Sequence, residues 1–325
     1  QYSERKGGYL ITRRSFLEQA GVFATGLLLT ETAAAHVMGH EAAAPSSEVI
    51  GAGVLTPFVD ELPLPPIVKS VGTRANPERS GEQIPYYRVA MREMRMKVHR
   101  DLPPTRVWGF DNSSPGPIFE TRSGEALLVE WANELPLKHF LPIDYTLHGA
   151  EKDVPEVRSV VHLHGGRTPP ESDGYPEDWY VPGKSAVNFY PNRQDATTLF
   201  YHDHAMGINR LNVYAGLQGM YVIRDAVEDA LNLPRGKYEV PLLIYDRFLR
   251  KDGQLEYPVS AIPGKPWVPE VFGNVVMVNG KVTPYLEVEP RKYRFRIVNG
   301  SNGRFYRLSF GDGHEFHMIG SDQGL

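Results

Sequence analysis

Apolar and polar residues alternate along much of the chain after residue 85, and a period of two residues is typical of half-buried β-strands. The expected strands cover residues 87–98, 105–110, 125–133, 238–245, 275–280 and 293–299. Turns rich in Pro and Gly, such as residues 114–119, separate these strands. Short strands joined by such turns predict an all-β protein built from tandem Greek-key β-sandwiches.

The same pattern predicts how the chain is divided. Residues 45–84 are rich in Pro, Gly and Ser and predict an extended arm over the surface. A first sandwich domain is expected over residues 85–228. A short helix at about residues 225–231 ends before Pro234 and marks a linker. Residues 229–325 then read as this linker and an incomplete second domain.

The first 44 residues resemble a targeting segment. Arg13 and Arg14 precede a short apolar stretch at residues 20–29, and small residues follow it. This order is typical of a twin-arginine export signal, and the stretch is too short for a comfortable membrane span. We therefore expect export to the periplasm, the cell surface or the medium. The alternative is a buried helix that follows a chance pair of arginines.

Composition excludes several classes of protein. The net charge is −4, so no electrostatic footprint for nucleic acid is visible. The sequence contains no Cys, which excludes a disulfide scaffold and a Cys-ligated zinc site. The 31 Gly and 27 Pro residues agree with many strands joined by turns.

Two His-X-His pairs carry most of the functional signal. His162 and His164 follow a Val-Val pair, and His202 and His204 follow the apolar residues 198–200. Alternate side chains of a strand share one face, so two such strands side by side would gather four imidazoles. Imidazole binds copper, zinc, iron and nickel, which predicts a metal site. The alternative is two buried pairs of hydrogen-bonded histidines.

Two acidic residues and one basic stretch accompany these pairs. Asp173 precedes Gly174 in a loop after the first pair and is either a proton-relaying carboxylate or a turn residue. Asp203 lies between two of the histidines, on the opposite face of its strand, and is expected to accept hydrogen bonds. Residues 290–296 alternate basic and aromatic residues, and we interpret them as a half-exposed strand instead of an RNA-binding surface.

At these residues the chain resembles the multicopper oxidases, and among them the bacterial laccases, spore-coat oxidases and bilirubin oxidases. The resemblance rests on residues 160–166, 172–177, 201–206, 210–217, 278–281 and 284–296, and covers most of residues 85–325. It implies tandem cupredoxin-like domains. A twin-arginine signal implies export of an already folded protein, often with its cofactor installed, and this agrees with a copper enzyme.

The resemblance further implies the metals and the reaction. His162 would bind the type 2 copper of a trinuclear cluster, and His164, His202 and His204 would bind the type 3 pair. A complete protein would hold four coppers, one of them in a mononuclear site. It would oxidise phenols, aromatic amines, bilirubin-like pigments or metal ions and reduce dioxygen to water. No nucleic acid or membrane span is expected to take part.

The family's C-terminal motifs, His-Pro-X-His-X-His and His-Cys-His-X3-His-X4-Met, are not in this sequence. We therefore expect this chain to be the N-terminal part of a longer protein. It would need a third domain to complete its metal site and would be inactive by itself. A non-enzymatic copper-binding or coat protein that keeps the fold is the first alternative. A metal hydrolase is the second, although the general-base motif His-Glu-X-X-His does not occur.

Overall fold

The computed structural model describes residues 46–51, 53–260, 268 and 270–325. The chain divides into two compact units, Gln1–Ala42 with Tyr306–His317, and Ala43–Phe305 with Met318–Leu325. Of the first unit only Tyr306–His317 is described. These residues form no helix or strand, and the rings of Phe310 and Phe316 meet edge to face. The expected export signal lies outside the described residues.

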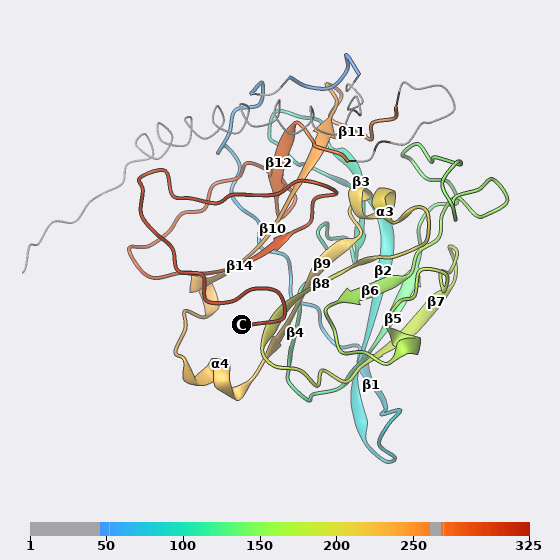
Figure 1. Cartoon of the computed structure of the whole chain (residues 1–325), viewed down its shortest axis with the longest axis vertical. Helices are drawn as coiled ribbons and strands as arrows, with labels where there is room; N and C mark the ends of the chain where they lie inside the picture. The colour runs from blue at the N-terminus through green and yellow to red at the C-terminus, as the bar shows by residue number, and fades with distance from the viewer. Residues whose placement is uncertain (1–45, 52, 261–267, 269) are drawn as a thin grey trace, which may run out of the picture. The chain divides into compact units, whose positions relative to one another are not determined.

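The second unit contains every helix and strand of the described residues, and strands predominate (Figure 1). The strands are β1 (Gly72–Ala75), β2 (Gln83–Met96), β3 (Thr105–Phe110), β4 (Phe119–Arg122), β5 (Leu127–Asn133), β6 (Val161–His164), β7 (Ser185–Tyr190), β8 (Thr197–Asp203), β9 (Gln218–Arg224), β10 (Glu239–Leu249), β11 (Leu255–Glu256), β12 (Val275–Val278), β13 (Lys281–Val282) and β14 (Arg294–Asn299). The helices are α3 (Asn209–Ala215) and α4 (Ala226–Ala230), with single 3₁₀ turns at Pro170–Ser172 and Gly236–Tyr238.

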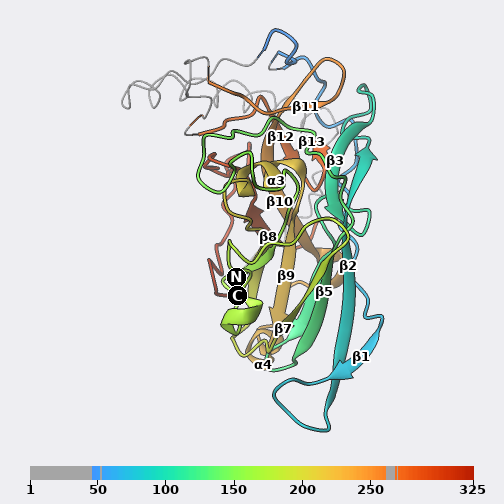
Figure 2. The same ribbon diagram turned by 90° about the vertical axis from the view of Figure 1, so that its right-hand side faces the viewer.

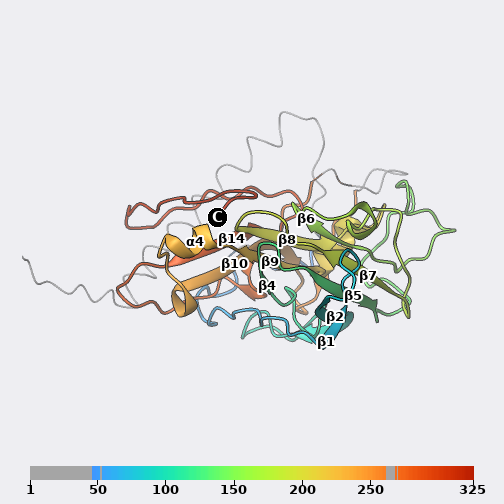
Figure 3. The same cartoon turned by 90° about the horizontal axis from the view of Figure 1, so that it is seen from below.

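Two sheets face each other and enclose the larger part of the core. One has the order β1-β2-β5-β7, with β3 also paired to β2, and the other has the order β4-β9-β8-β6. Trp131 of β5 and Phe110 of β3 both lie against Tyr201 of β8, with ring centroids 5.3 and 5.2 Å apart. Figures 2 and 3 show the sheets as two layers. The alternation in each strand places its apolar residues between the layers, and the all-β prediction is confirmed.

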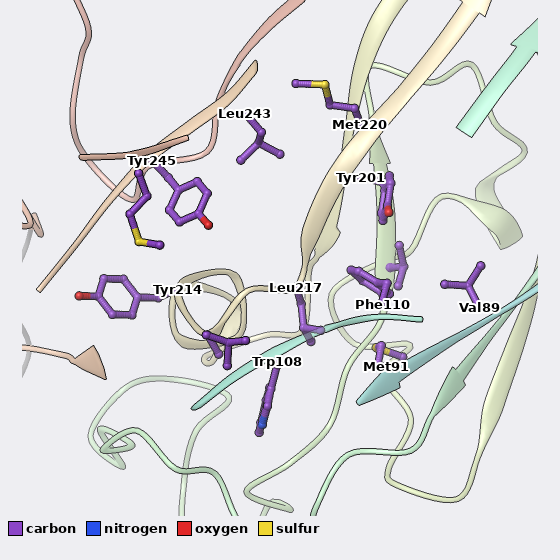
Figure 4. Packing of buried hydrophobic residues seen from close by; sticks show 14 of the residues in the cluster. Val89, Met91, Trp108, Phe110, Tyr201, Tyr214, Leu217, Met220, Leu243 and Tyr245 are labelled. Atoms are coloured by element: carbon purple, nitrogen blue, oxygen red, sulfur yellow. The ribbon is translucent and has the colours of Figure 1, made fainter. Parts of the chain in front are cut away.

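A third sheet has the order β11-β10-β12-β13, with β14 parallel to β10. Leu243 and Tyr245 of β10 belong to the same hydrophobic core as Tyr214 and Leu217, which follow the second His pair (Figure 4). The core therefore continues without a break from the two-layer sandwich into this sheet.

The arm predicted at residues 45–84 is extended, but it is part of both sheet systems. The backbone N–H of Ile50 donates to Leu249 O of β10, and that of Val68 donates to Ile118 O beside β4. The arm ends in β1, which pairs with β2. These bonds satisfy backbone groups that a loose surface segment would leave to water.

The helix predicted at residues 225–231 is α4, which Asp225 caps by accepting a hydrogen bond from the N–H of Glu228 at 2.7 Å. Helix α3 was not predicted. Five of its seven residues are buried, including Leu211 and Tyr214. Three of its seven residues are polar, and so short a segment shows no readable helical period, so its conformation is decided by packing.

In the part of the chain that the structure describes, no helix combines the length and the apolar character needed to cross a membrane.

Candidate metal centre

The four histidines are brought together by the pairing of β6 with β8. These strands are antiparallel, and His162 lies directly opposite His202. Leu163 and Tyr201, which are paired next to them, point into the core and are almost fully buried. Alternation then forces the histidines onto the other face. His204 follows the end of β8, and its N–H donates to Val160 O at 2.8 Å.

The imidazole rings form one cluster, which we call the imidazole cluster. Its ring centroids are 4.6 Å apart for His162 and His204, 5.6 Å for His162 and His164, 5.6 Å for His162 and His202, 5.6 Å for His164 and His202, and 5.7 Å for His202 and His204. His202 is buried and His164 is exposed, so the cluster opens to the surface on one side. All four residues predicted from sequence thus lie together.

Backbone carbonyls fix the tautomer of three rings. The Nδ1–H groups of His162, His202 and His204 donate to Asp173 O at 2.5 Å, Asp203 O at 2.7 Å and Gly174 O at 2.9 Å, respectively. A proton held on Nδ1 leaves Nε2 as the nitrogen with a free lone pair. Metal-binding histidines are oriented in the same way by a hydrogen bond from their other nitrogen.

The loop around Asp173 supplies two of these carbonyls, and Gly174 allows it to do so. Gly174 has φ +76°, and a Cβ there would lie 2.2 Å from Val161 O, so only glycine fits. The Asp173 carboxylate accepts a hydrogen bond from Thr168 Oγ1 at 2.7 Å and lies 3.6 Å from His162 Nδ1. Its side chain is 44% exposed, so the carboxylate connects the cluster with solvent.

His164 and His202 face each other through nitrogen atoms. His164 Nδ1 lies 3.4 Å from His202 Nε2. Because His202 carries its proton on Nδ1, a lone pair of His202 points at His164. Two imidazole nitrogens that face each other across such a gap could bind the same cation. Imidazole is a good ligand for copper, so the donor set fits this metal. Within the described residues, no three His, Cys, Asp or Glu side chains are gathered closely enough to form a metal site by themselves.

Burial favours the neutral form of two of the four imidazoles, those of His162 and His202. Burial lowers the pKa of His202 to about 3, and the hydrogen bond to Asp203 O only partly opposes it. Burial also lowers the pKa of His162, against the effect of Asp173, while the neighbouring imidazoles add to the lowering. Neutral imidazole is the form that binds a metal, so these two rings are ready to bind at neutral pH.

Asp203 lies on the opposite face of β8 and has no exposed surface. Its carboxylate accepts hydrogen bonds from Ser159 Oγ at 2.6 Å and from the N–H of Ala205 at 3.1 Å. Burial raises its pKa to about 6, although the hydrogen bonds from Ser159 and Asn212 act in the opposite direction. The structure thus agrees with the predicted role of hydrogen-bond acceptor.

Sequence reasoning missed the buried polar side chains behind the cluster. Arg158 is 1% exposed and donates to the carbonyls of Pro155, Gly149 and Met206. Asn212 donates to Arg158 O at 2.9 Å. A single Arg and a single Asn in an apolar segment form no motif, so no signal in the sequence pointed to them.

Other histidines of the second compact unit lie apart from the imidazole cluster. His148 is exposed, with Nδ1 3.4 Å from the Glu151 carboxylate. His139 is hydrogen bonded to Asn212 Oδ1 and packs on Trp108.

Fold and site together define a class: an all-β protein in which paired strands present a cluster of metal-binding imidazoles. Comparisons with known proteins narrow this class. A profile described as multicopper oxidase matches residues 152–228. A laccase of Bacillus stratosphericus is 50% identical over 83% of this chain and 55% of its own length. A laccase of Bacillus subtilis (strain 168) is 49% identical over the same shares.

A solved structure agrees. The multicopper oxidase of the hyperthermophile Aquifex aeolicus is 26% identical, with a TM-score of 0.59 over 77% of this chain and 47% of that protein. The chain therefore belongs to the multicopper oxidase family. It spans about half the length of the curated relatives it matches.

Proposed function

We propose that this chain is part of a copper-dependent oxidase of laccase type. Such an enzyme takes electrons from phenolic or aromatic donors, or from metal ions, and reduces dioxygen to water. The observation that carries the proposal is the imidazole cluster, in which three rings are held with their proton on Nδ1 and a lone pair on Nε2. Two similar proteins that bear the name laccase support the reaction class.

In this proposal the four imidazoles divide between copper ions. His164 and His202, whose nitrogens face each other, would share one ion of the type 3 pair, and His204 would hold the other. His162 would hold the type 2 ion. Copper bound there would supply one-electron redox capacity and open positions for dioxygen. Four coppers per complete protein are expected, with the remaining ligands in a third domain beyond the domains proposed at residues 85–228 and 229–325.

The residues of this chain would do the positioning and the proton handling. The carbonyls of Asp173 and Gly174 hold two rings in one tautomer. The Asp173 carboxylate, half exposed and close to His162, is proposed to carry protons from solvent toward the cluster. The Asp173→Asn variant should lower oxygen uptake by about 10²-fold and alter its pH profile, with copper content unchanged. An unaltered pH profile would exclude the relay.

Metal analysis tests the copper proposal. The full-length protein, expressed with copper and zinc both present, should hold about four coppers, the number implied by the family. His162→Ala and His204→Ala should lower the copper content, whereas the exposed His148→Ala should not. Protein that holds zinc and no copper would refute the proposal. The chain as given should show neither oxidase activity nor intense blue colour, because it offers no Cys thiolate.

Export by the twin-arginine route is also proposed, on the basis of Arg13 and Arg14 before an apolar stretch. Replacing both with Lys should leave precursor in the cytoplasm, as measured by cell fractionation. Export equal to that of the parent would show that these residues form no such signal.

A further inference from the structure

We propose that Asp203 is a positioning residue for the imidazole cluster. Its carboxylate fixes the turn that carries His204 and holds the imidazoles in alignment before any metal binds. The meaning of this role for catalysis rests on the proposed function, but the alignment is a property of the metal-free chain.

The carboxylate connects the two chain segments that carry the two His pairs. Alternation along β8 turns Asp203 away from the cluster, into a region without solvent. One oxygen accepts from Ser159 Oγ, which lies just before β6, and the other accepts from the N–H of Ala205, just after His204. A single fully buried group thus links the start of the first His strand with the end of the second.

Polar side chains near Asp203 hold the turn after His204 at further points. The side-chain amide of Asn209 donates to Asp203 O. Arg158 donates to Met206 O at 2.7 Å, two residues beyond His204. Asn212 of α3 donates in turn to Arg158 O. The first bond holds the same carbonyl that accepts from the His202 ring, and the other two fix the backbone before the first His pair and after the second.

Removal of the carboxylate would leave the Ser159 hydroxyl and the Ala205 N–H buried without acceptors, which is costly enough to make the turn shift. A shift there moves the His204 ring, whose Nδ1–H reaches Gly174 O at 2.9 Å. Loss of groups that orient metal ligands typically lowers metal affinity by about 10–100-fold. A purely structural carboxylate would lower stability and leave the orientation of the rings in the folded fraction unchanged.

The test uses the full chain of 325 residues, purified without metal. Nitrogen-15 NMR of the imidazoles reports which nitrogen carries the proton, and titration with Cu(II) reports affinity. In the parent chain, His162, His202 and His204 should carry the proton on Nδ1. In both Asp203→Ala and Ser159→Ala, the rings of His202 and His204 should show mixed tautomers. The affinity for Cu(II) should fall by about 10–100-fold in Asp203→Ala and by a smaller factor in Ser159→Ala.

Asp195→Asn is the matched control, because Asp195 is an exposed acid just before β8. It should keep the parent tautomers and bind Cu(II) within about twofold of the parent, well short of the 10-fold loss expected at Asp203. If Asp203→Ala does not fold, Asp203→Asn and Ser159→Ala decide the question.

A folded Asp203 variant with parent tautomers or with parent affinity would overturn the proposal. If the parent chain binds no copper, the copper proposal fails at this chain, while the tautomers of the metal-free protein still decide the role of Asp203.

Discussion

Two polar clusters lie at opposite ends of β8, and they differ in how their polar atoms are satisfied. The imidazole cluster occupies the C-terminal end. Near the other end, Thr198 Oγ1 accepts a hydrogen bond from Arg296 at 2.7 Å. Arg296 belongs to a second group, which we call the ionic cluster and which consists of Arg224, Glu228, Glu239, Arg294 and Arg296.

The charged groups of the ionic cluster pair mainly with one another, and Arg224 also donates to the exposed Glu120. Glu239 accepts from Arg296 Nε at 2.6 Å and from Arg224 Nη2 at 2.9 Å, and Glu228 pairs with Arg294 and Arg296. Glu228 is 1% exposed. Although burial alone would raise the pKa of Glu239, Arg224 and Arg296 outweigh it, and the net shift is downward. Only Glu228 Oε2 and Arg294 Nη2 are buried there without a hydrogen bond.

The imidazole cluster is built the opposite way. Its Nδ1–H groups are satisfied by carbonyls, and the Nε2 atoms of His162 and His204 have no hydrogen-bond partner within the described residues. Buried polar groups are normally paired, so charges that pair with each other indicate a structural role. Oriented lone pairs without a partner, beside an opening to the surface, indicate a binding site. The kind of partner that the polar atoms have, more than their burial, thus separates the two clusters. In the ionic cluster opposite charges pair with each other, whereas in the imidazole cluster two Nε2 lone pairs have no protein partner within the described residues.

The largest expected effect breaks the ionic cluster. Glu228→Gln leaves Arg294 and Arg296 buried with one acid fewer, and loss of one partner from a buried pair costs about 3–5 kcal/mol. Urea unfolding measures this loss. Glu134→Gln, which removes exposed pairs to Arg88 and Arg92, should cost less than about 1 kcal/mol. Equal losses in the two variants would refute a structural role for the ionic cluster.

A second prediction separates the clusters by pH. The folded-state pKa of His202 is about 3, against 6.5 when unfolded. Between these values the unfolded chain binds a proton that the folded chain does not, so stability falls as pH falls, by up to about 1.4 kcal/mol per pH unit. His202→Asn in metal-free protein should therefore flatten the pH dependence of stability below pH 6.5.

The ionic cluster sets the lower limit of this pH window. The lowered pKa of Glu239 adds stability above its ordinary value of 4.5, which is lost only as pH falls below that value. The raised pKa of Asp203 changes stability in the opposite direction, because on lowering the pH the folded chain binds this proton before the unfolded chain does. Asp203 is present in both the parent and His202→Asn, so its effect cancels in their comparison. Parallel stability curves for parent and His202→Asn between pH 6.5 and 4.5 would contradict the prediction.

A third prediction concerns the carbonyls that orient the rings. Gly174→Ala places a Cβ against Val161 O in a left-handed conformation and should cost about 2–3 kcal/mol and disturb the tautomers of His162 and His204. Gly183 has a similar φ of +84° with open space around it, so Gly183→Ala should cost about 1 kcal/mol. Urea unfolding and imidazole NMR measure both variants. A Gly174→Ala protein no less stable than Gly183→Ala would show that the loop can move away.

The smallest expected effect on stability is that of a ligand itself. His162→Ala should change the free energy of unfolding of metal-free protein by less than about 1 kcal/mol, since its ring is partly exposed and its Nε2 has no partner to lose. Copper binding by the cluster should fall nonetheless. A loss as large as that of Glu228→Gln would mean that the imidazole cluster is structural.

Local pattern was enough to predict several of the strands, among them β2, β3, β5 and β10, and the face that each His pair presents. The period of two residues follows from backbone geometry, so His162 and His164 share a face wherever their strand lies. The resemblance of residues 160–166 and 201–206 to a known family indicated that the two pairs belong together. The short helix at α4 was equally readable, because Asp225 is a local cap.

Strand β14 shows where local pattern misleads. Its basic and apolar residues alternate, and the usual assignment would expose the charges. Instead Arg294 and Arg296 are 5% exposed, while Phe295 and Ile297 are 37% and 45% exposed. The acids that pair with the arginines, Glu228 and Glu239, are separated from them by more than fifty residues in sequence, so no local window contains the reason.

The sequence by itself therefore determined the all-β class, the shared face of each His pair and the four imidazoles, because these depend on the alternation of side chains and on short motifs. Only the tertiary structure decided which atoms complete them: the carbonyls of Asp173 and Gly174 behind two rings, the contact of His164 with His202, and the buried carboxylate of Asp203 behind the turn. Hydrogen bonds between distant segments require both partners at fixed positions in space, and those positions exist only once the sheets have packed.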